Sequence, residues 1–188
     1  MTNRYEGTNT DMSVVIAVTN QKGGVGKTTT AVNVAYFLAK EGKRTLIVDF
    51  DPQGNATSGL GIDKQQVAAT SSEVVLGEVS LADAIVRTEH KNLSLVASTP
   101  HLANTEVDLA KVEGKFTRLQ EAVNSVAEDY DYIIIDSPPS LSLLTVNGLI
   151  AANYILLPVQ ADFYALEGLG QLLETMKLVR KGVNPNLE

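Results

Sequence analysis

The chain contains four runs of mainly apolar residues, and none of them alternates apolar with polar positions. They cover residues 14–18, 45–48, 132–135 and 154–157. Strands that are buried on both faces, as in a parallel sheet covered by helices, show this continuous pattern. The four runs therefore predict four buried strands. A weaker strand is predicted over residues 93–97.

Helical spacing of apolar residues is found between these runs. We expect helices over residues 28–40 and 81–87, and two further helices whose apolar stripes face the core. The two stripes are Phe116, Leu119, Val123 and Val126, and then Phe163, Leu166, Leu169, Leu173, Met176 and Val179, with Gly182 ending the second helix. Strands that alternate with helices predict an α/β fold: a doubly wound, mainly parallel sheet with helices on both faces.

Composition narrows the class of protein. A chain of 188 residues is typical of one domain, which we place at residues 13–188 behind a polar, disordered tail at 1–12. The absence of cysteine excludes disulfides, thiolate metal sites and cysteine nucleophiles. No apolar run is long enough to span a membrane and we expect no signal peptide, so a cytoplasmic location is expected. The net charge of −7 is not typical of a nucleic-acid-binding protein.

The most informative segment lies between the first apolar run and the helix that follows it. Its glycines allow the backbone to approach an anion closely, and the N–H groups at the start of the helix then point at phosphates. We expect Lys27 to reach the outer phosphates and the Thr28 hydroxyl to join the Mg²⁺ shell. The predicted nucleotide-binding residues are Gly23, Gly24, Val25, Gly26, Lys27, Thr28 and Thr29.

The details of this loop point to one family. Gln21 stands where the general phosphate-loop pattern has its first glycine, and a second lysine, Lys22, lies five residues before Lys27. This arrangement resembles the deviant Walker A loop of the ParA/MinD family of dimerising ATPases. The resemblance implies that Lys22 reaches across a dimer to the partner's nucleotide and acts in catalysis; a solvated loop lysine is the alternative.

Two aspartates follow the second apolar run. Asp51 lies 24 residues after Lys27, a spacing that fits one right-handed crossover, so the strand should return to the edge that holds the phosphate loop. Asp49 and Asp51 should share one side if that strand continues to Asp51. The segment 51–57 is similar to the family's first switch, in which the aspartate at this position orients the attacking water. A turn that merely ends a strand is the alternative.

A third carboxylate closes the run at 132–135. Asp136 has the form of a Walker B aspartate, which would hold Mg²⁺ through a coordinated water. The predicted Mg²⁺-binding residues are therefore Thr28, Asp51 and Asp136. The following segment 137–140 is similar to the family's second switch, although two prolines after a strand can simply end it.

Together these motifs resemble ParA-type partition ATPases over residues 14–185. The resemblance implies Mg·ATP binding, an ATP-bound homodimer, slow ATP hydrolysis to ADP and phosphate stimulated by a ParB-type centromere-binding protein, and association with the nucleoid through non-specific DNA binding. The domain is expected to be incomplete at its C-terminus, where the family carries DNA-contacting residues, so we do not expect DNA binding from this segment alone. No membrane partner is expected.

Three other interpretations remain open. A MinD-like ATPase that cycles on membranes would share the loop but would carry a C-terminal amphipathic helix. A binding module on a degenerate P-loop fold would not depend on nucleotide. A ligase-like metabolic enzyme would act on a small acid substrate.

Overall fold

One six-stranded sheet organises the chain in the computed structural model, which describes residues 13–160 and 165–188. The strand order is β3-β4-β2-β5-β1-β6, and all neighbours are parallel except β3 and β4. The strands are β1 (Val14–Val18), β2 (Thr45–Asp49), β3 (Ile85–Arg87), β4 (Leu93–Val96), β5 (Tyr132–Asp136) and β6 (Tyr154–Leu156). The helices are α1 (Lys27–Lys40), α2 (Asn55–Gly59), α3 (Ser71–Leu76), α4 (Leu81–Ala84), α5 (His101–Leu109), α6 (Arg118–Asn124), α7 (Leu143–Ala151) and α8 (Ala165–Gly182).

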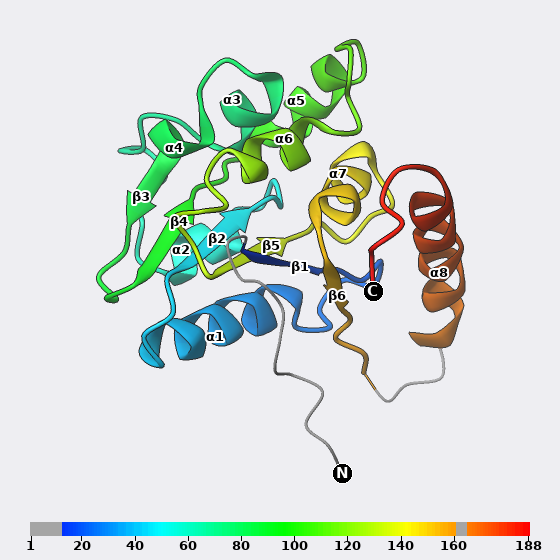
Figure 1. The fold of residues 1–188 in the computed structure, drawn as a ribbon, viewed down its shortest axis with the longest axis horizontal. Coiled ribbons are helices and arrows are strands. Elements are labelled where there is room, and N and C mark those ends of the chain that lie inside the picture. The colour runs from blue at the N-terminus through cyan, green and yellow to red at the C-terminus, as the bar shows by residue number, and fades with distance from the viewer. Residues whose placement is uncertain (1–12, 161–164) are drawn as a thin grey trace.

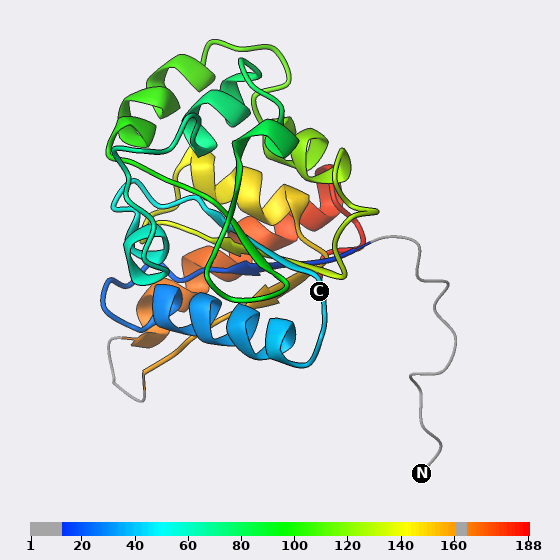
Figure 2. The same cartoon turned by 90° about the vertical axis from the view of Figure 1, so that its left-hand side faces the viewer.

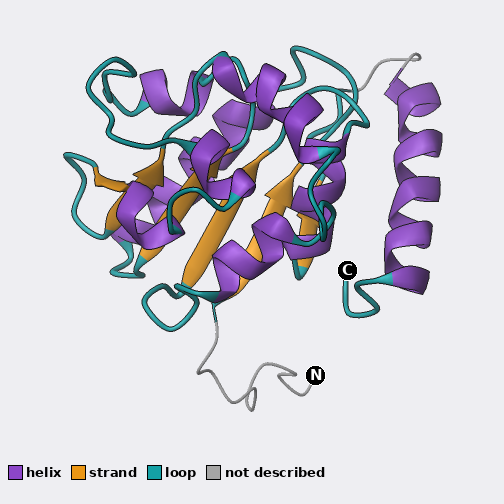
Figure 3. Cartoon of the chain, turned by 90° about the horizontal axis from the view of Figure 1, so that it is seen from above, coloured by secondary structure: helices purple, strands orange, loops and turns teal. Residues whose placement is uncertain are grey.

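Helices cover both faces of the sheet, as Figure 1 and Figure 2 show. On one face, α1 and α2 bury small side chains such as Ala31 and Ala35 against β1, β2, β4 and β5. On the other face, α3, α5, α6 and α7 form a larger apolar layer. Helix α8 lies beside α7, outside the β6 edge, and contributes Leu172 and Val179 to that layer (Figure 3). The doubly wound α/β fold predicted from the sequence is confirmed.

The predicted strands are all present, but one predicted helix is wrong in its second half. The helix expected over residues 81–87 ends at Ala84, and Ile85–Arg87 instead forms the antiparallel edge strand β3 against β4. Ile85 and Val86 are β-branched, and such side chains favour a strand wherever a neighbouring edge is free to pair. Helical spacing continued through these residues, so the sequence pattern did not reveal the change.

Two members of the predicted core stripes are also wrong. Leu119, Val123 and Val126 are buried as expected, whereas Phe116 precedes α6 and is 46% exposed. In α8 the buried positions include Leu172 and Val179, whereas Leu173 is exposed, because α8 packs on α7 at the end of the sheet and not over its centre. The predicted tail at 1–12, Phe163 and the side chain of Leu166 lie outside the described residues. Helix α8 ends at Gly182, as predicted.

The β6 edge carries one further parallel pairing. Ile155 N donates to Glu188 O at 2.7 Å, and Glu188 N donates to Asn153 O at 2.9 Å. These two bonds have the pattern of a parallel bridge at one residue, and they place Glu188 beside β6. Within the described part of the chain, no helix is both long enough and apolar enough to cross a membrane.

Candidate nucleotide site

The loop between β1 and α1 adopts the backbone conformation that a phosphate cradle needs. Gly24 and Gly26 have φ values of 73° and 89°, in the left-handed region that glycine adopts without strain. Thr30 N donates to Gly26 O at 2.8 Å, which closes the first turn of α1. Between Gly23 and Thr29, no backbone N–H donates a hydrogen bond to another described residue. These amides are therefore available to an anion at the start of α1.

Lys27 places its amine in the mouth of this loop. Lys27 is only 7% exposed, and its Nζ donates to the Lys22 carbonyl oxygen at 3.1 Å. Burial lowers the pKa of Lys27, while the carboxylates of Asp136 and Asp51 act in the opposite direction. The lysine therefore lies between backbone and carboxylates, where the charge of a bound polyphosphate would favour its protonated form.

Two side chains brace the loop against the end of the sheet. Asn20 accepts from Lys22 N at 3.0 Å through Oδ1 and donates from Nδ2 to the Pro158 carbonyl at 2.8 Å. Gln160 donates from Nε2 to Gly24 O at 3.2 Å. The loop is thus tied to the segment after β6, which lies next to β1 in the sheet.

Asp136 occupies the centre of the carboxyl edge of the sheet. It pairs in register with Val18 of β1 on one side and with Asp49 of β2 on the other. Its side chain is fully buried, and burial raises its pKa to about 7. The nearby Thr28 hydroxyl and the charge of Lys27 oppose this rise, whereas the negative charges of Asp49 and Asp51 add to it. Neither carboxylate oxygen has a partner of regular hydrogen-bond geometry among the described residues.

Asp49 and Asp51 meet the same edge, although not as one continuous strand. Strand β2 ends at Asp49, so the condition for the two side chains to share one strand face is not met. Asp49 accepts from Thr57 N at 2.8 Å and from Thr57 Oγ1 at 2.6 Å, and burial raises its pKa to about 6. Asp51 accepts from Gln53 N at 2.9 Å in the turn that follows.

The second predicted switch leaves β5 directly after Asp136. Ser137 is buried, and its hydroxyl has no hydrogen-bond partner among the described residues. Thr145 Oγ1 donates to Ser140 O at 2.6 Å, and Leu143 N donates to Glu106 Oε1 at 2.6 Å at the start of α7. The segment is thus anchored at its far end to α7 and α5.

These residues fit Mg²⁺ and a nucleoside triphosphate. The amides at the start of α1 suit phosphate oxygens, and the unpartnered Asp136 oxygens and the Thr28 hydroxyl suit a hard cation. The part of the chain that is described contains no cluster of three or more His, Cys, Asp or Glu residues able to hold a metal ion alone. Mg²⁺ commonly binds through one or two carboxylates, waters and substrate phosphates, which agrees with such a sparse site.

The structure brings the predicted residues together and adds others that sequence analysis missed. The loop residues from Lys22 to Thr29, Asp51 and Asp136 converge at the carboxyl end of the parallel sheet, where such folds bind ligands. The additional residues are Asn20, Ser98 and Thr57; the last lies within the predicted first switch, but sequence analysis assigned it no role of its own. Ser98 directly follows a predicted strand. Because parallel strands end at the same edge of a sheet, this position could have placed Ser98 near the site.

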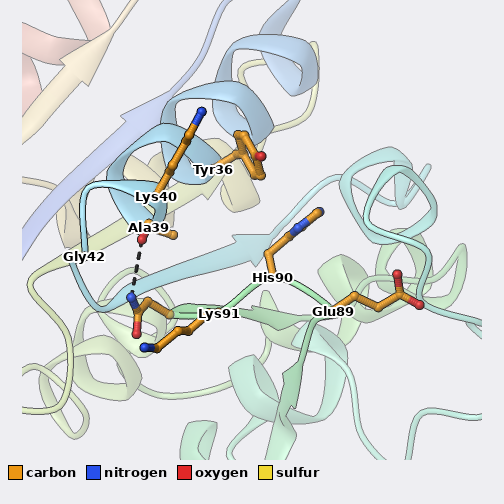
Figure 4. A pocket seen from close by; sticks show the side chains of 8 residues that line it. Tyr36, Ala39, Lys40, Gly42, Glu89, His90 and Lys91 are labelled. Carbon is orange, nitrogen blue, oxygen red and sulfur yellow. Dashed lines mark hydrogen bonds between the residues drawn. The ribbon is translucent and has the colours of Figure 1, made fainter.

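A separate pocket lies at the far end of α1. It has a volume of about 410 Å³ and is shown in Figure 4. The Tyr36 and His90 rings meet edge to face there, with centroids 4.9 Å apart, and Asn92 Nδ2 donates to Ala39 O at 3.4 Å. Lys27 begins α1 and this pocket surrounds its last turn, so the pocket is not part of the nucleotide site.

The parallel sheet with a glycine-rich loop between its β1 strand and α1 defines a P-loop NTPase of the deviant Walker A class. A family model described as an AAA domain matches residues 13–188. Soj, the sporulation initiation inhibitor protein of Bacillus subtilis, is 50% identical over 176 residues, and ParA, a chromosome partitioning protein of Myxococcus xanthus, is 49% identical over 174 residues. The chain belongs to the ParA-type partition ATPase family.

Solved structures agree with this assignment of the fold. A Mycobacterium smegmatis protein named cobyrinic acid a,c-diamide synthase, with bound ADP and magnesium, superposes with a TM-score of 0.89 at 41% identity, covering 94% of this chain and 71% of that one. A variant of Cyanothece McdA in complex with ATP has a TM-score of 0.87 at 30% identity, covering 94% and 68%. The matches to Soj and ParA cover 94% and 93% of this chain but 70% and 62% of those relatives.

Proposed function

We propose that this protein is an ATP-dependent switch in chromosome partitioning, which binds Mg·ATP, dimerises in that state and hydrolyses ATP to ADP and phosphate. The observation that carries the proposal is the convergence of Lys27, Asp51 and Asp136 beside unpaired loop amides. Relatives named for chromosome partitioning are 42–49% identical, whereas the plasmid partition proteins among the structural neighbours are 28–31% identical. This difference favours a chromosomal role.

Each site residue has a distinct task in the proposed reaction. The amides of residues 23–29 and the Lys27 ammonium would bind the phosphates, while Thr28 and Asp136 would hold Mg²⁺, the latter through water. Bound Mg²⁺ would supply charge neutralisation on the phosphoryl oxygens. Asp51 would orient the attacking water and lie near the metal, and Lys22 of the partner copy would approach the transferred phosphoryl group. Positioning and charge stabilisation dominate catalysis in phosphoryl transfer.

The remaining partners follow from family membership. A ParB-type centromere-binding protein would stimulate hydrolysis, and the ATP-bound dimer of the protein would associate with the nucleoid through non-specific DNA contacts. The net charge of −7 supplies no general attraction to DNA, so such contacts would depend on a local basic surface. We place this cycle in the cytoplasm.

Light scattering of the Asp51→Ala variant, with and without Mg·ATP, tests the proposal. Loss of the water-orienting carboxylate should trap the ATP-bound state, so a monomer should become a dimer only when Mg·ATP is present. Lys27→Ala in the same background is the matched control and should remain monomeric. A monomer under all conditions would contradict the dimerising switch.

A second candidate comes from the name of one structural neighbour, cobyrinic acid a,c-diamide synthase. That name describes the formation of amides from a carboxylic acid. Phosphate release by the wild type with no acid substrate present, and its acceleration by a DNA-bound ParB-type protein, would favour the partition switch. Release that depends strictly on an added acid would favour the ligase.

A further inference from the structure

A single residue after β4 contacts both ends of the first switch segment. Ser98 is fully buried, and its hydroxyl donates to Asp51 O at 2.8 Å. Its N–H donates to Thr57 Oγ1 at 3.0 Å. Its carbonyl oxygen lies against Gly54, where an added Cβ would come within 2.5 Å. One residue therefore contacts the beginning, the middle and the end of segment 51–57.

Thr57 links this contact to the end of β2. Its hydroxyl donates to Asp49 Oδ2 at 2.6 Å while it accepts from Ser98 N. The other oxygen of Asp49 accepts from Asp51 N at 3.3 Å. The main chain of Asp51 is thus held on its N–H side by Asp49 and on its carbonyl side by Ser98, and Thr57 joins these two anchors.

The position of Asp51 explains why such anchoring matters. Asp51 lies beyond the last residue of β2, so its main chain is not bonded to a neighbouring strand. Its N–H donates to the Asp49 side chain, and its carbonyl oxygen accepts from the Ser98 hydroxyl and from Gly54 N. A misplacement of about 1 Å at a reacting centre can cost about 100-fold in rate. A buried hydrogen-bond network whose members are satisfied is rigid enough to prevent such a displacement.

We propose that Thr57 and Ser98 are positioning residues that hold Asp51 in the geometry needed for ATP hydrolysis. The inference rests on the proposed function, because it assumes that Asp51 orients the attacking water. Neither residue would touch nucleotide or metal. Both would act through the Asp51 main chain, so they would affect the chemical step and leave nucleotide binding intact.

Two substitutions at Thr57 separate positioning from ordinary core packing. Thr57→Val keeps the shape and removes the hydroxyl, whereas Thr57→Ser keeps the hydroxyl and removes a methyl group. Ser98→Ala removes the second anchor. Thr105→Val is the matched control, since Thr105 is also buried and bonds a backbone carbonyl, at 3.2 Å, but within α5.

Steady-state ATP hydrolysis with Mg²⁺ should show a fall in kcat of about 10- to 100-fold for Thr57→Val and Ser98→Ala, with KM unchanged. Thr57→Ser should keep most of the turnover, and Thr105→Val all of it. In the Asp51→Ala background, Ser98→Ala should cause no further loss, because the residue that it positions is already gone. Among these variants, only Thr57→Val and Ser98→Ala should show faster amide hydrogen exchange over residues 51–57.

The outcomes separate the inference from the proposed function. Turnover by Thr57→Val at the wild-type rate would overturn the inference while the ATPase assignment stands. Equal losses for Thr57→Val and Thr57→Ser would also overturn it, since packing and not the hydroxyl would then be responsible. If the wild type binds Mg·ATP without hydrolysing it, the proposed function fails, and exchange over 51–57 decides whether the two residues hold that segment.

Discussion

Asp136 ends the central strand β5 with a fully buried carboxylate, and replacing it with asparagine removes the charge while nearly keeping the shape. Burial raises the pKa of Asp136 from 3.8 to about 7. Below pH 3.8 the folded and unfolded states both hold the proton. Between pH 3.8 and about 7 only the folded state holds it, so the free energy of unfolding falls as the pH rises. Above about pH 7 neither state holds the proton, and this group no longer changes the free energy of unfolding.

The magnitude follows from the two pKa values. Between pH 5 and pH 8 this one group should lower the free energy of unfolding of the wild type by about 2 to 3 kcal/mol, at about 1.4 kcal/mol for each unit of pKa difference. In Asp136→Asn this contribution disappears. The buried amide costs about 1–3 kcal/mol where it lacks a partner, but that cost is the same at every pH and cancels from the comparison.

Chemical denaturation at intervals from pH 5 to pH 8, without nucleotide and with Mg²⁺ chelated, measures this difference. The stability of the variant should decline less than that of the wild type by about 2 to 3 kcal/mol over this range. Asp129→Asn, at an exposed carboxylate, is the matched control. If the free energies of unfolding of the wild type and Asp136→Asn change in parallel with pH, then burial does not raise the pKa of Asp136 as argued.

Three further predictions concern the loop and the first switch. Lys27→Ala should weaken Mg·ATP binding by about 10- to 100-fold or more, because a charge-assisted hydrogen bond contributes about 1.5–3 kcal/mol, and calorimetry showing undiminished affinity would contradict the assignment of the loop. Lys22→Ala should bind Mg·ATP as a monomer but lose the ATP-dependent dimer in light scattering, and unchanged dimers would exclude a role across the interface. Gly54→Ala should lower the free energy of unfolding by at least about 1–2 kcal/mol, because Gly54 has a φ of 61° and faces Ser98 O. The control is Gly61→Ala, which has a φ of 75° with no atom within 4 Å of its added Cβ, and an equal loss in both would show that contact with Ser98 is unimportant.

Features encoded in contiguous residues could be predicted from the sequence. The phosphate loop depends on glycine spacing between a strand and a helix, and every part of it lies within residues 14–40. The strands were visible because both faces of a covered parallel sheet are apolar. Asp51 and Asp136 could be placed at one edge, since parallel strands joined by right-handed crossovers end on the same side.

Pairings between distant segments could not be predicted in this way. Ile85–Arg87 is a strand only because the edge of β4 is free to accept it, and periodicity within that segment contains no information about β4. Leu173 and Leu172 are equally apolar, and which of them is buried depends on how α8 packs on α7. The order that places β5 between β1 and β2 is likewise a property of the assembled sheet.

The sequence by itself determined the fold class, the phosphate loop and the identity of the acidic residues, because each of these depends on local spacing and on where apolar runs end. Only the tertiary structure decided how those residues are held. The buried contact from Ser98 to Asp51 joins positions 47 residues apart. The raised pKa of Asp136 arises from its burial between β1 and β2 and from the nearby charges of Asp49 and Asp51. Burial and long-range hydrogen bonds depend on the whole packed molecule, so no local pattern encodes them.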